Sequence, residues 1–156
     1  MLVVLIWVLL QASLSFSASS SSNAIDNRWR RDANWAQSRM KLANCAVGFG
    51  SATNGGKGGQ IYTVTNPDDN PTNPLLGSLR YGVTRKNPLW IVFAKDMSIK
   101  LQMLLSVASH KTIDGRGANV EISNGPCIHL DNMNNIIIHG LNIHDCKPNV
   151  AGMLKI

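Results

Sequence analysis

Apolar and polar residues alternate with a period of two through residues 111–146, in runs of only three to five residues. A two-residue period is typical of half-buried strands, because successive side chains of a strand point to opposite faces of a sheet. The sequence therefore predicts a series of very short strands. Their apolar positions are Ile113, then Val120 and Ile122, then Ile128 and Leu130, then Ile136 and Ile138, then Leu141 and Ile143.

The breaks between these strands are rich in residues that form tight turns. They are Asp114-Gly115, Asn124-Gly125-Pro126, the cluster at residues 132–135, and Gly140. Glycine and asparagine tolerate positive φ, and short polar side chains can hydrogen-bond to their own backbone. Each strand is therefore expected to end in a turn rather than in a long loop.

Equivalent strands recur at a nearly constant distance along the chain. The distance is 23 residues from Ile113 to Ile136 and 21 residues from Val120 to Leu141. A chain with a repeat of this length can wind into stacked coils, so we expect an all-β fold, a right-handed parallel β-helix. A β-sandwich, whose strands recur about every eight to twelve residues, fits the spacing of single strands equally well and stays open.

The pattern upstream is less regular. It predicts strands over residues 61–64, 79–83 and 89–93, with a loop rich in proline, asparagine and aspartate over residues 66–74. Before them, Asn34 can cap a helix whose apolar positions Ala36, Met40, Ala43 and Val47 share one face, with Gly48 as its stop. A flexible glycine-rich loop over residues 48–59 then holds six of the thirteen glycines.

Composition adds a leader segment to this picture. Residues 1–18 carry no charged side chain and contain a continuous apolar run over residues 2–10, which is typical of a secretory signal peptide. The run is too short to span a membrane, which takes about 20 apolar residues. We expect cleavage between residues 17 and 21. The chain then divides into a signal peptide at 1–18, an N-terminal arm with a helix and the glycine-rich loop at 19–60, and the start of the coiled region at 61–156.

Secretion places the three cysteines in an oxidising compartment, where disulfides persist. Cys127 and Cys146 lie about one coil apart, so stacking would bring them together, and we expect them to form a disulfide. Cys45 is left without a partner.

The net charge of +6 lies outside the uncharged leader. A basic secreted protein is attracted to polyanions, which include acidic polysaccharides as well as nucleic acid and membrane surfaces, although an excess of Lys and Arg also occurs on ordinary soluble surfaces. The basic residues are dispersed and the aromatic residues few, so no nucleic-acid platform is indicated.

No candidate chemistry emerges from individual residues. Asp68 and Asp69 are expected to be solvated turn residues, because no third cation ligand lies at a suitable spacing. His129, His139 and His144 lie in strands without a carboxylate partner or a metal spacing as a set. His144 and Asp145 are adjacent, but neighbours in a strand point to opposite faces and are not expected to pair. We therefore assign no catalytic, cofactor-binding or metal-binding residue.

Five long blocks of the sequence resemble a known family. They are RWRRDANWAQSRMKLANCAVGFG (28–50), GGKGGQIYTVTNPDDNPTNPLLGSLRYGV (55–83), PLWIVFAKDMSIKL (88–101), TIDGRGANV (112–120) and NIIIHGLNIHDCKP (135–148). Together they are similar to the N-terminal portion of plant pectate lyases and the related pollen allergens, nearly unbroken over residues 23–148. The resemblance implies a right-handed parallel β-helix, secretion to the cell wall, and calcium-dependent eliminative cleavage of de-esterified pectin. Polygalacturonate, the acidic polysaccharide partner, also suits the basic charge.

The chain departs from the family pattern in two ways. The family has a cysteine on each side of the Trp29-Arg30 pair, where this chain has Arg28 and Arg31; one of those cysteines would be the partner of Cys45. The resemblance also implies that the family's calcium-binding acidic residues and its arginine base follow the HDCKP block, after which only residues 149–156 remain. The resemblance thus implies calcium as a cofactor but gives it no ligand here, and the chain, truncated at its C-terminus, is expected to be inactive alone and monomeric if folded.

Two further readings remain open. The chain could act as a non-catalytic, secreted, cationic protein that binds polysaccharide through its first coils. It could also be another enzyme of similar fold, such as a polygalacturonase, but that chemistry needs clustered aspartates, and no such cluster can be recognised in the sequence.

Overall fold

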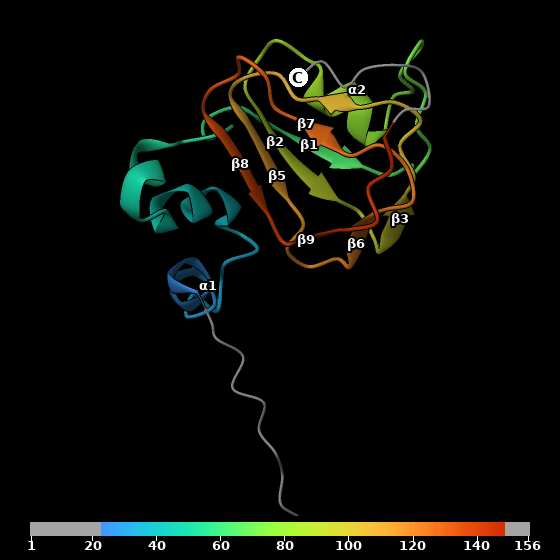
Figure 1. The fold of residues 1–156 in the computed structure, drawn as a ribbon. Coiled ribbons are helices and arrows are strands. Elements are labelled where there is room, and N and C mark those ends of the chain that lie inside the picture. The colour runs from blue at the N-terminus through green and yellow to red at the C-terminus, as the bar shows by residue number, and fades with distance from the viewer. Residues whose placement is uncertain (1–22, 149–156) are drawn as a thin grey trace, which may run out of the picture.

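The computed structural model describes residues 23–148, which form three sheets of parallel strands (Figure 1). The predicted signal peptide and residues 149–156 lie outside this range. The largest sheet contains β1 (Gln60–Val64), β2 (Leu89–Phe93), β5 (Lys111–Asp114) and β8 (Ile136–His139), in that order. A second sheet contains β3 (Met97–Ile99), β6 (Val120–Ile122) and β9 (Leu141–Ile143), and β4 (Leu105–Ser106) pairs with β7 (Ile128–His129).

The chain visits the three sheets in a repeating order. From β2 it passes through β3 and β4, and from β5 it passes through β6 and β7 before reaching β8 and β9. Every strand pairing in residues 23–148 is parallel, so the antiparallel sandwich is excluded for this part of the chain. Val120 pairs with Leu141 as the spacing predicts, whereas Ile113 pairs with Ile138, one strand period beyond the expected Ile136.

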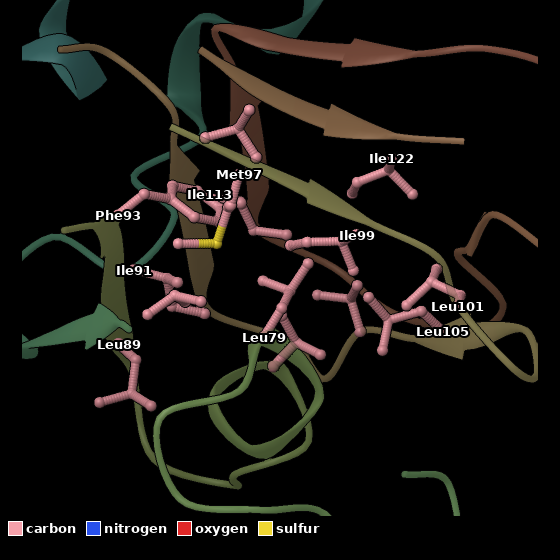
Figure 2. Packing of buried hydrophobic residues seen from close by; sticks show 14 residues of the cluster. Leu79, Leu89, Ile91, Phe93, Met97, Ile99, Leu101, Leu105, Ile113 and Ile122 are labelled. Atoms are coloured by element: carbon pink, nitrogen blue, oxygen red, sulfur yellow. The ribbon is translucent and has the colours of Figure 1, made fainter. Parts of the chain in front are cut away.

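Alternation along the strands separates two apolar clusters. Side chains that point into the coil form the main core, which includes Ile91, Ile113 and Ile122 (Figure 2). Trp90 and Val92 point the other way and pack with residues of the N-terminal arm. All five residues of β2 are therefore buried, because both faces of this strand are covered.

One charged side chain also points into the coil. Lys111 shares a face with Ile113, and its side chain is fully buried. Its Nζ donates 2.9 Å hydrogen bonds to the carbonyl oxygens of Asn87 and Ser109. Burial of the ammonium lowers the pKa of Lys111, because removal from water disfavours the charged form.

The predicted turn chemistry is confirmed in the coiled region. Asn124, Asn132 and Asn135 adopt positive φ, as does Gly140. Asn135 also fixes a distant loop, since its Oδ1 accepts hydrogen bonds of 2.8 and 2.9 Å from the backbone N–H groups of residues 54 and 55. The asparagines thus end strands and, in one case, join parts of the chain far apart in sequence.

The arm contains helical structure, but the prediction of an α-helix over residues 34–47 is wrong. The α-helix of the arm lies earlier in the chain: it is α1 (Ala24–Trp29), capped by Asn23, whose Oδ1 accepts a 2.8 Å hydrogen bond from the Asp26 backbone. Residues 32–41 form turns with hydrogen bonds between residues three apart, which lead into the 3₁₀ helix η1 (Arg39–Cys45). Its buried residues are Leu42, Ala43 and Cys45, a tighter spacing than the α-helical face that was expected.

Only part of the glycine-rich segment is packed onto the sheet, because residues 48–52 are exposed. It begins with the 3₁₀ helix η2 (Gly48–Ala52), and Gly55 and Gly56 are buried beyond it. A Cβ at Gly56 would lie about 1.8 Å from the carbonyl oxygen of Leu89, so only glycine allows the backbone to come this close. The Gly56 N–H donates a 3.0 Å hydrogen bond to Oγ1 of Thr112.

The segment predicted as a strand at residues 79–83 is the short helix α2 (Leu79–Val83). The hydroxyl of Ser78 caps it by accepting a 3.3 Å hydrogen bond from the Tyr81 backbone. Leu79 and Val83 are both buried, and their i, i+4 spacing gives a helix one apolar side. Five residues are too few for periodicity to distinguish the two structures.

The cysteines lie as expected. Cys127 and Cys146 form a disulfide, which closes a loop with a sequence separation of 19. Loops of this size are stabilised by about 3 kcal/mol when closed. Cys45 is a free, buried thiol. Within residues 23–148, no helix is long and apolar enough to cross a membrane.

Candidate functional site

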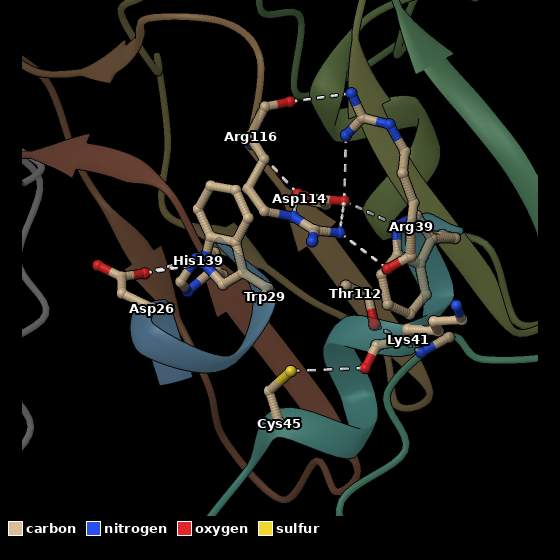
Figure 3. A network of polar contacts seen from close by, with 11 residues as sticks. Asp26, Trp29, Arg39, Lys41, Cys45, Thr112, Asp114, Arg116 and His139 are labelled. Atoms are coloured by element: carbon tan, nitrogen blue, oxygen red, sulfur yellow. Dashed lines mark hydrogen bonds and ion pairs between the residues drawn. The ribbon is translucent and has the colours of Figure 1, made fainter. Parts of the chain in front are cut away.

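The outer face of the largest sheet carries a buried polar network that holds the N-terminal arm (Figure 3). Asp114, at the end of β5, points outward beside Val92 and His139 of the neighbouring strands. Its side chain is fully buried and accepts hydrogen bonds from two arginines and a tryptophan. The two carboxylate oxygens contact Nε and Nη2 of Arg116 at 2.8 and 2.7 Å, and Oδ2 also contacts Nη1 of Arg39 at 3.1 Å and Nε1 of Trp90 at 3.0 Å.

The two arginines of this network hold each other's backbone. Nη2 of Arg39 donates to the carbonyl oxygen of Arg116 at 2.9 Å, and Nη2 of Arg116 donates to the carbonyl oxygen of Arg39 at 2.8 Å. Both guanidinium groups also lie over the ring of Trp35, at 4.8 and 5.0 Å. The network thus joins η1 to the turn after β5 through charge, hydrogen bonds and aromatic contact.

The Asp114 carboxyl is held in its ionised form. Burial acts to raise its pKa, but the hydrogen bonds and charge of Arg116 and the hydrogen bond from Trp90 outweigh burial, so the pKa of Asp114 is lowered. A carboxylate whose oxygens are all engaged and whose pKa is low is a poor proton acceptor at neutral pH. Asp114 is therefore an anchor for the arm rather than an acid or base.

His139 forms a second contact between the arm and the sheet. Its Nε2 lies 3.3 Å from Oδ1 of Asp26 in α1, and its ring meets the edge of Trp29 at 5.9 Å. These residues border a hollow of about 420 Å³ that Arg30 and Arg116 also line. Burial lowers the pKa of His139, with Asp26 acting in the opposite direction, so the imidazole is neutral at pH 7.

Acidification is expected to loosen α1 from the sheet. The folded-state pKa of His139 lies below its unfolded value near 6.5, so the undocked state binds more protons as the pH falls. The contribution of His139 to docking is present above about pH 6.5 and is lost below it. When hydrogen exchange of α1 amides is measured from about pH 7.5 down to 5, the protection factors should fall, so that exchange slows less than the intrinsic base-catalysed rate does. A His139→Gln variant should lose this extra pH dependence; an unchanged profile in the variant would contradict the assignment.

The expectations for His144 are wrong on two points. His144 does have carboxylate partners, because its Nδ1 lies 2.8 Å from Oδ2 of Asp145 and its Nε2 lies 3.4 Å from Oε1 of Glu121. The expected opposite orientation of His144 and Asp145 is wrong, since β9 ends at Ile143 and Asp145 has a positive φ of 49°. The hydrogen bond that the Asp145 carboxylate accepts from the imidazole raises the pKa of His144. His129 lies exposed at the end of β7.

The expectation for the acidic pair is half wrong. Asp69 is buried and binds Arg80 through both oxygens, at 2.6 Å to Nε and 2.8 Å to Nη2, whereas Asp68 is exposed. The carboxylate of Asp69 also accepts a 2.8 Å hydrogen bond from the Gln102 backbone. Arg80 and this backbone N–H use the oxygens that a cation would need.

Calcium therefore finds no fitting site in the described residues. In residues 23–148, no group of three or more His, Cys, Asp or Glu side chains is arranged to hold a metal ion. The carboxylates that are buried, Asp69 and Asp114, are neutralised by arginine. This set of residues does not fit the hard-cation chemistry that the resemblance implies.

Sequence reasoning missed the Asp114 network. Asp114 was recognised only as part of a turn, and Arg39 lies 75 residues away from it. The one local signal is that an acidic residue at the end of a strand is followed two positions later by an arginine, which permits the bidentate contact seen here.

Comparisons with known proteins find relatives that match this chain over most of its length. Pectate lyase 1 of Juniperus virginiana is 60% identical over 133 residues, which are 85% of this chain and 36% of the relative. Pectate lyase 1 of Cryptomeria japonica is 56% identical over 149 residues, 95% of this chain and 40% of the relative. Probable pectate lyase 16 of Arabidopsis thaliana is 58% identical over 85% of this chain and 34% of its own length. No protein-family model matches the sequence.

The fold has a solved counterpart. The crystal structure of jun a 1, the major allergen from cedar pollen, superposes with a TM-score of 0.75 at 60% sequence identity and covers 79% of this chain and 36% of that chain. The chain is therefore an all-β protein whose parallel strands stack in repeating coils, and it shares this fold with jun a 1. Within that class the chain is similar to plant pectate lyases, and it spans between about a third and two fifths of the length of the curated relatives it matches.

Proposed function

We propose that this chain builds the first coils of a right-handed parallel β-helix in a secreted pectate lyase. The observation that carries the proposal is the identity of 56 to 60% to proteins named pectate lyase 1, spread over a chain whose strands stack as in jun a 1. In this proposal residues 1–18 direct secretion to the cell wall. The whole protein cleaves de-esterified pectin by elimination with calcium, and the folded chain is a monomer.

The described residues supply scaffold and polymer attraction in this proposal. The Asp114 network fixes the arm on the sheet, and the net charge of +6 favours contact with polygalacturonate, which carries a carboxylate on each sugar. Calcium binding and proton abstraction are assigned to residues outside 23–148, because the carboxylates described here do not form a calcium site.

A segment exchange tests the family function. Residues 23–148 of this chain replace the matching segment of Juniperus virginiana pectate lyase 1, and release of unsaturated product from polygalacturonate is measured with and without calcium. We expect the chimera to retain calcium-dependent cleavage. The unexchanged relative is the positive control, and a thermal melt identifies a chimera that fails to fold. A folded chimera without activity would overturn the proposal.

A second candidate is a non-catalytic protein that binds acidic polysaccharide. The basic arm favours it, since residues 23–59 carry six of the fifteen basic residues and two of the nine acidic residues. When binding to polygalacturonate is measured in parallel with product release, the 156-residue chain alone is expected to bind the polymer without releasing unsaturated product. Cleavage by the purified chain alone would overturn this second candidate.

A further inference from the structure

Two adjoining hollows lie beside η1 in the arm. One has a volume of about 240 Å³ and the other about 360 Å³. They adjoin at Ser38, Lys41 and Asn44, which line both, and we call the two hollows together the arm groove. Arg28 and Trp35 line its first half, and Lys57 lines the second.

Of the five cations that line the arm groove, Arg39 and Arg116 are paired with the buried Asp114, whereas Arg28, Lys41 and Lys57 have exposed side chains that a ligand can reach. Within residues 23–148, Arg28 and Lys57 form no ion pair: Nη1 of Arg28 donates to the carbonyl oxygen of Cys45 at 3.5 Å, and Nζ of Lys57 donates to Oδ1 of Asn44 at 2.7 Å. Lys41 pairs with Asp32 at 3.5 Å, but its side chain is 67% exposed, so water and salt screen this pair. Asp32 is the one carboxylate among the residues that line the groove.

The neutral residues of the groove suit a sugar. The Ser38 hydroxyl and the Asn44 amide can exchange hydrogen bonds with hydroxyl groups, because each offers both donor and acceptor atoms. Trp35 gives one wall an aromatic, largely apolar surface, and its ring is fixed by the arginines stacked on it. Hydroxyl partners, an aromatic wall and separated cations are what a chain of carboxylated sugars requires.

We infer that the arm groove is a binding site for a uronate oligosaccharide, in which Arg28, Lys41 and Lys57 contact the carboxylates of successive sugars. The inference rests on the proposed function for the identity of the polymer. It adds a specific location, because the arm lies outside the coil beside the sheet (Figure 1).

The test compares two double variants of the full chain. Lys41→Gln with Lys57→Gln removes two charges from the groove, whereas Lys86→Gln with Lys95→Gln removes the same charge from exposed positions elsewhere. Binding of a galacturonate hexamer is measured by calorimetry at fixed ionic strength. We expect the groove variant to lose about tenfold in affinity and the control variant to stay within about threefold of the parent. All four lysines are exposed, so a thermal melt should show equal stability for the variants.

Two further ligands define the specificity. A methyl-esterified hexamer has the same sugars without the charge, and a short DNA duplex has the charge without the sugars; both are expected to bind at least tenfold more weakly than the galacturonate hexamer. Equal losses in the groove and control variants, or DNA binding as tight as that of the hexamer, would show general charge attraction and overturn the groove.

The groove and the proposed function can fail separately. If the parent chain does not bind the hexamer while the chimera still cleaves polygalacturonate, the groove is wrong and the pectate lyase assignment stands. If the groove variant alone loses binding while a folded chimera is inactive, the groove stands and the enzymatic assignment fails.

Discussion

Replacing Asp114 with asparagine is expected to destabilise the protein by about 3–5 kcal/mol, because it leaves the guanidinium of Arg116 buried without its counter-charge. This loss is a large share of the roughly 5–15 kcal/mol that stabilises a typical domain. The free energy of unfolding from urea titration measures it directly. The arm should also detach, because Arg39 loses its contact with β5.

Two comparisons make this prediction specific to the buried charge. Asp131→Asn makes the same chemical change at an exposed position and should shift stability by less than about 0.5 kcal/mol. Arg39→Gln removes the link to the arm but leaves the Arg116 pair intact, so its effect should be smaller than that of Asp114→Asn. If Asp114→Asn costs no more than Asp131→Asn, the network does not hold the arm.

Replacing Asp69 with asparagine is the second substitution with a large expected effect, again about 3–5 kcal/mol of unfolding free energy. Asp69 is the only carboxylate that Arg80 contacts within residues 23–148, and the side chain of Arg80 is 7% exposed. The remaining bonds of Arg80, to the carbonyl oxygens of Met103 and Leu104, do not neutralise its charge. Thermal and urea denaturation of the variant should both show the loss.

The neighbouring residue provides a matched control for this substitution. Asp68→Asn alters the adjacent, exposed side chain and is expected to leave stability within about 0.5 kcal/mol of the parent. The pair therefore separates a buried ion pair from a solvated turn residue at consecutive positions. Similar values for the two variants would mean that the contact between Asp69 and Arg80 does not stabilise the loop.

Most strands from β5 to β9 could be predicted because apolar residues recur two positions apart and asparagine or glycine follows within a few residues, although β8 has three consecutive isoleucines and β9 is followed by His144 and Asp145. Pattern failed where a segment was too short, as at Leu79 and Val83, whose spacing fits a strand and a helix equally well. It failed in the arm because packing against Trp90 and the contacts of Arg39 determine the local structure there, and these partners lie far away in sequence.

The candidate site was less accessible from the sequence than the fold. Asp69 and Asp114 read as ordinary turn residues, and only their arginine partners show that they are buried anchors. The histidines were misjudged for a related reason, since the partner of His139 comes from α1, a helix that the sequence pattern did not indicate. Pairings of this kind depend on tertiary structure and leave no periodic signal.

The buried ammonium of Lys111 selects one alignment of the coils. β8 begins with three consecutive isoleucines, so the apolar pattern alone would tolerate sliding this strand along β5. Sliding β5 along β2 would instead withdraw Nζ from the carbonyl oxygen of Asn87, which precedes β2, and leave the buried ammonium with fewer hydrogen-bond partners. A single buried cation lowers stability where it lies, but it destabilises misaligned strand pairings even more. It therefore favours the observed register between coils whose apolar patterns are similar.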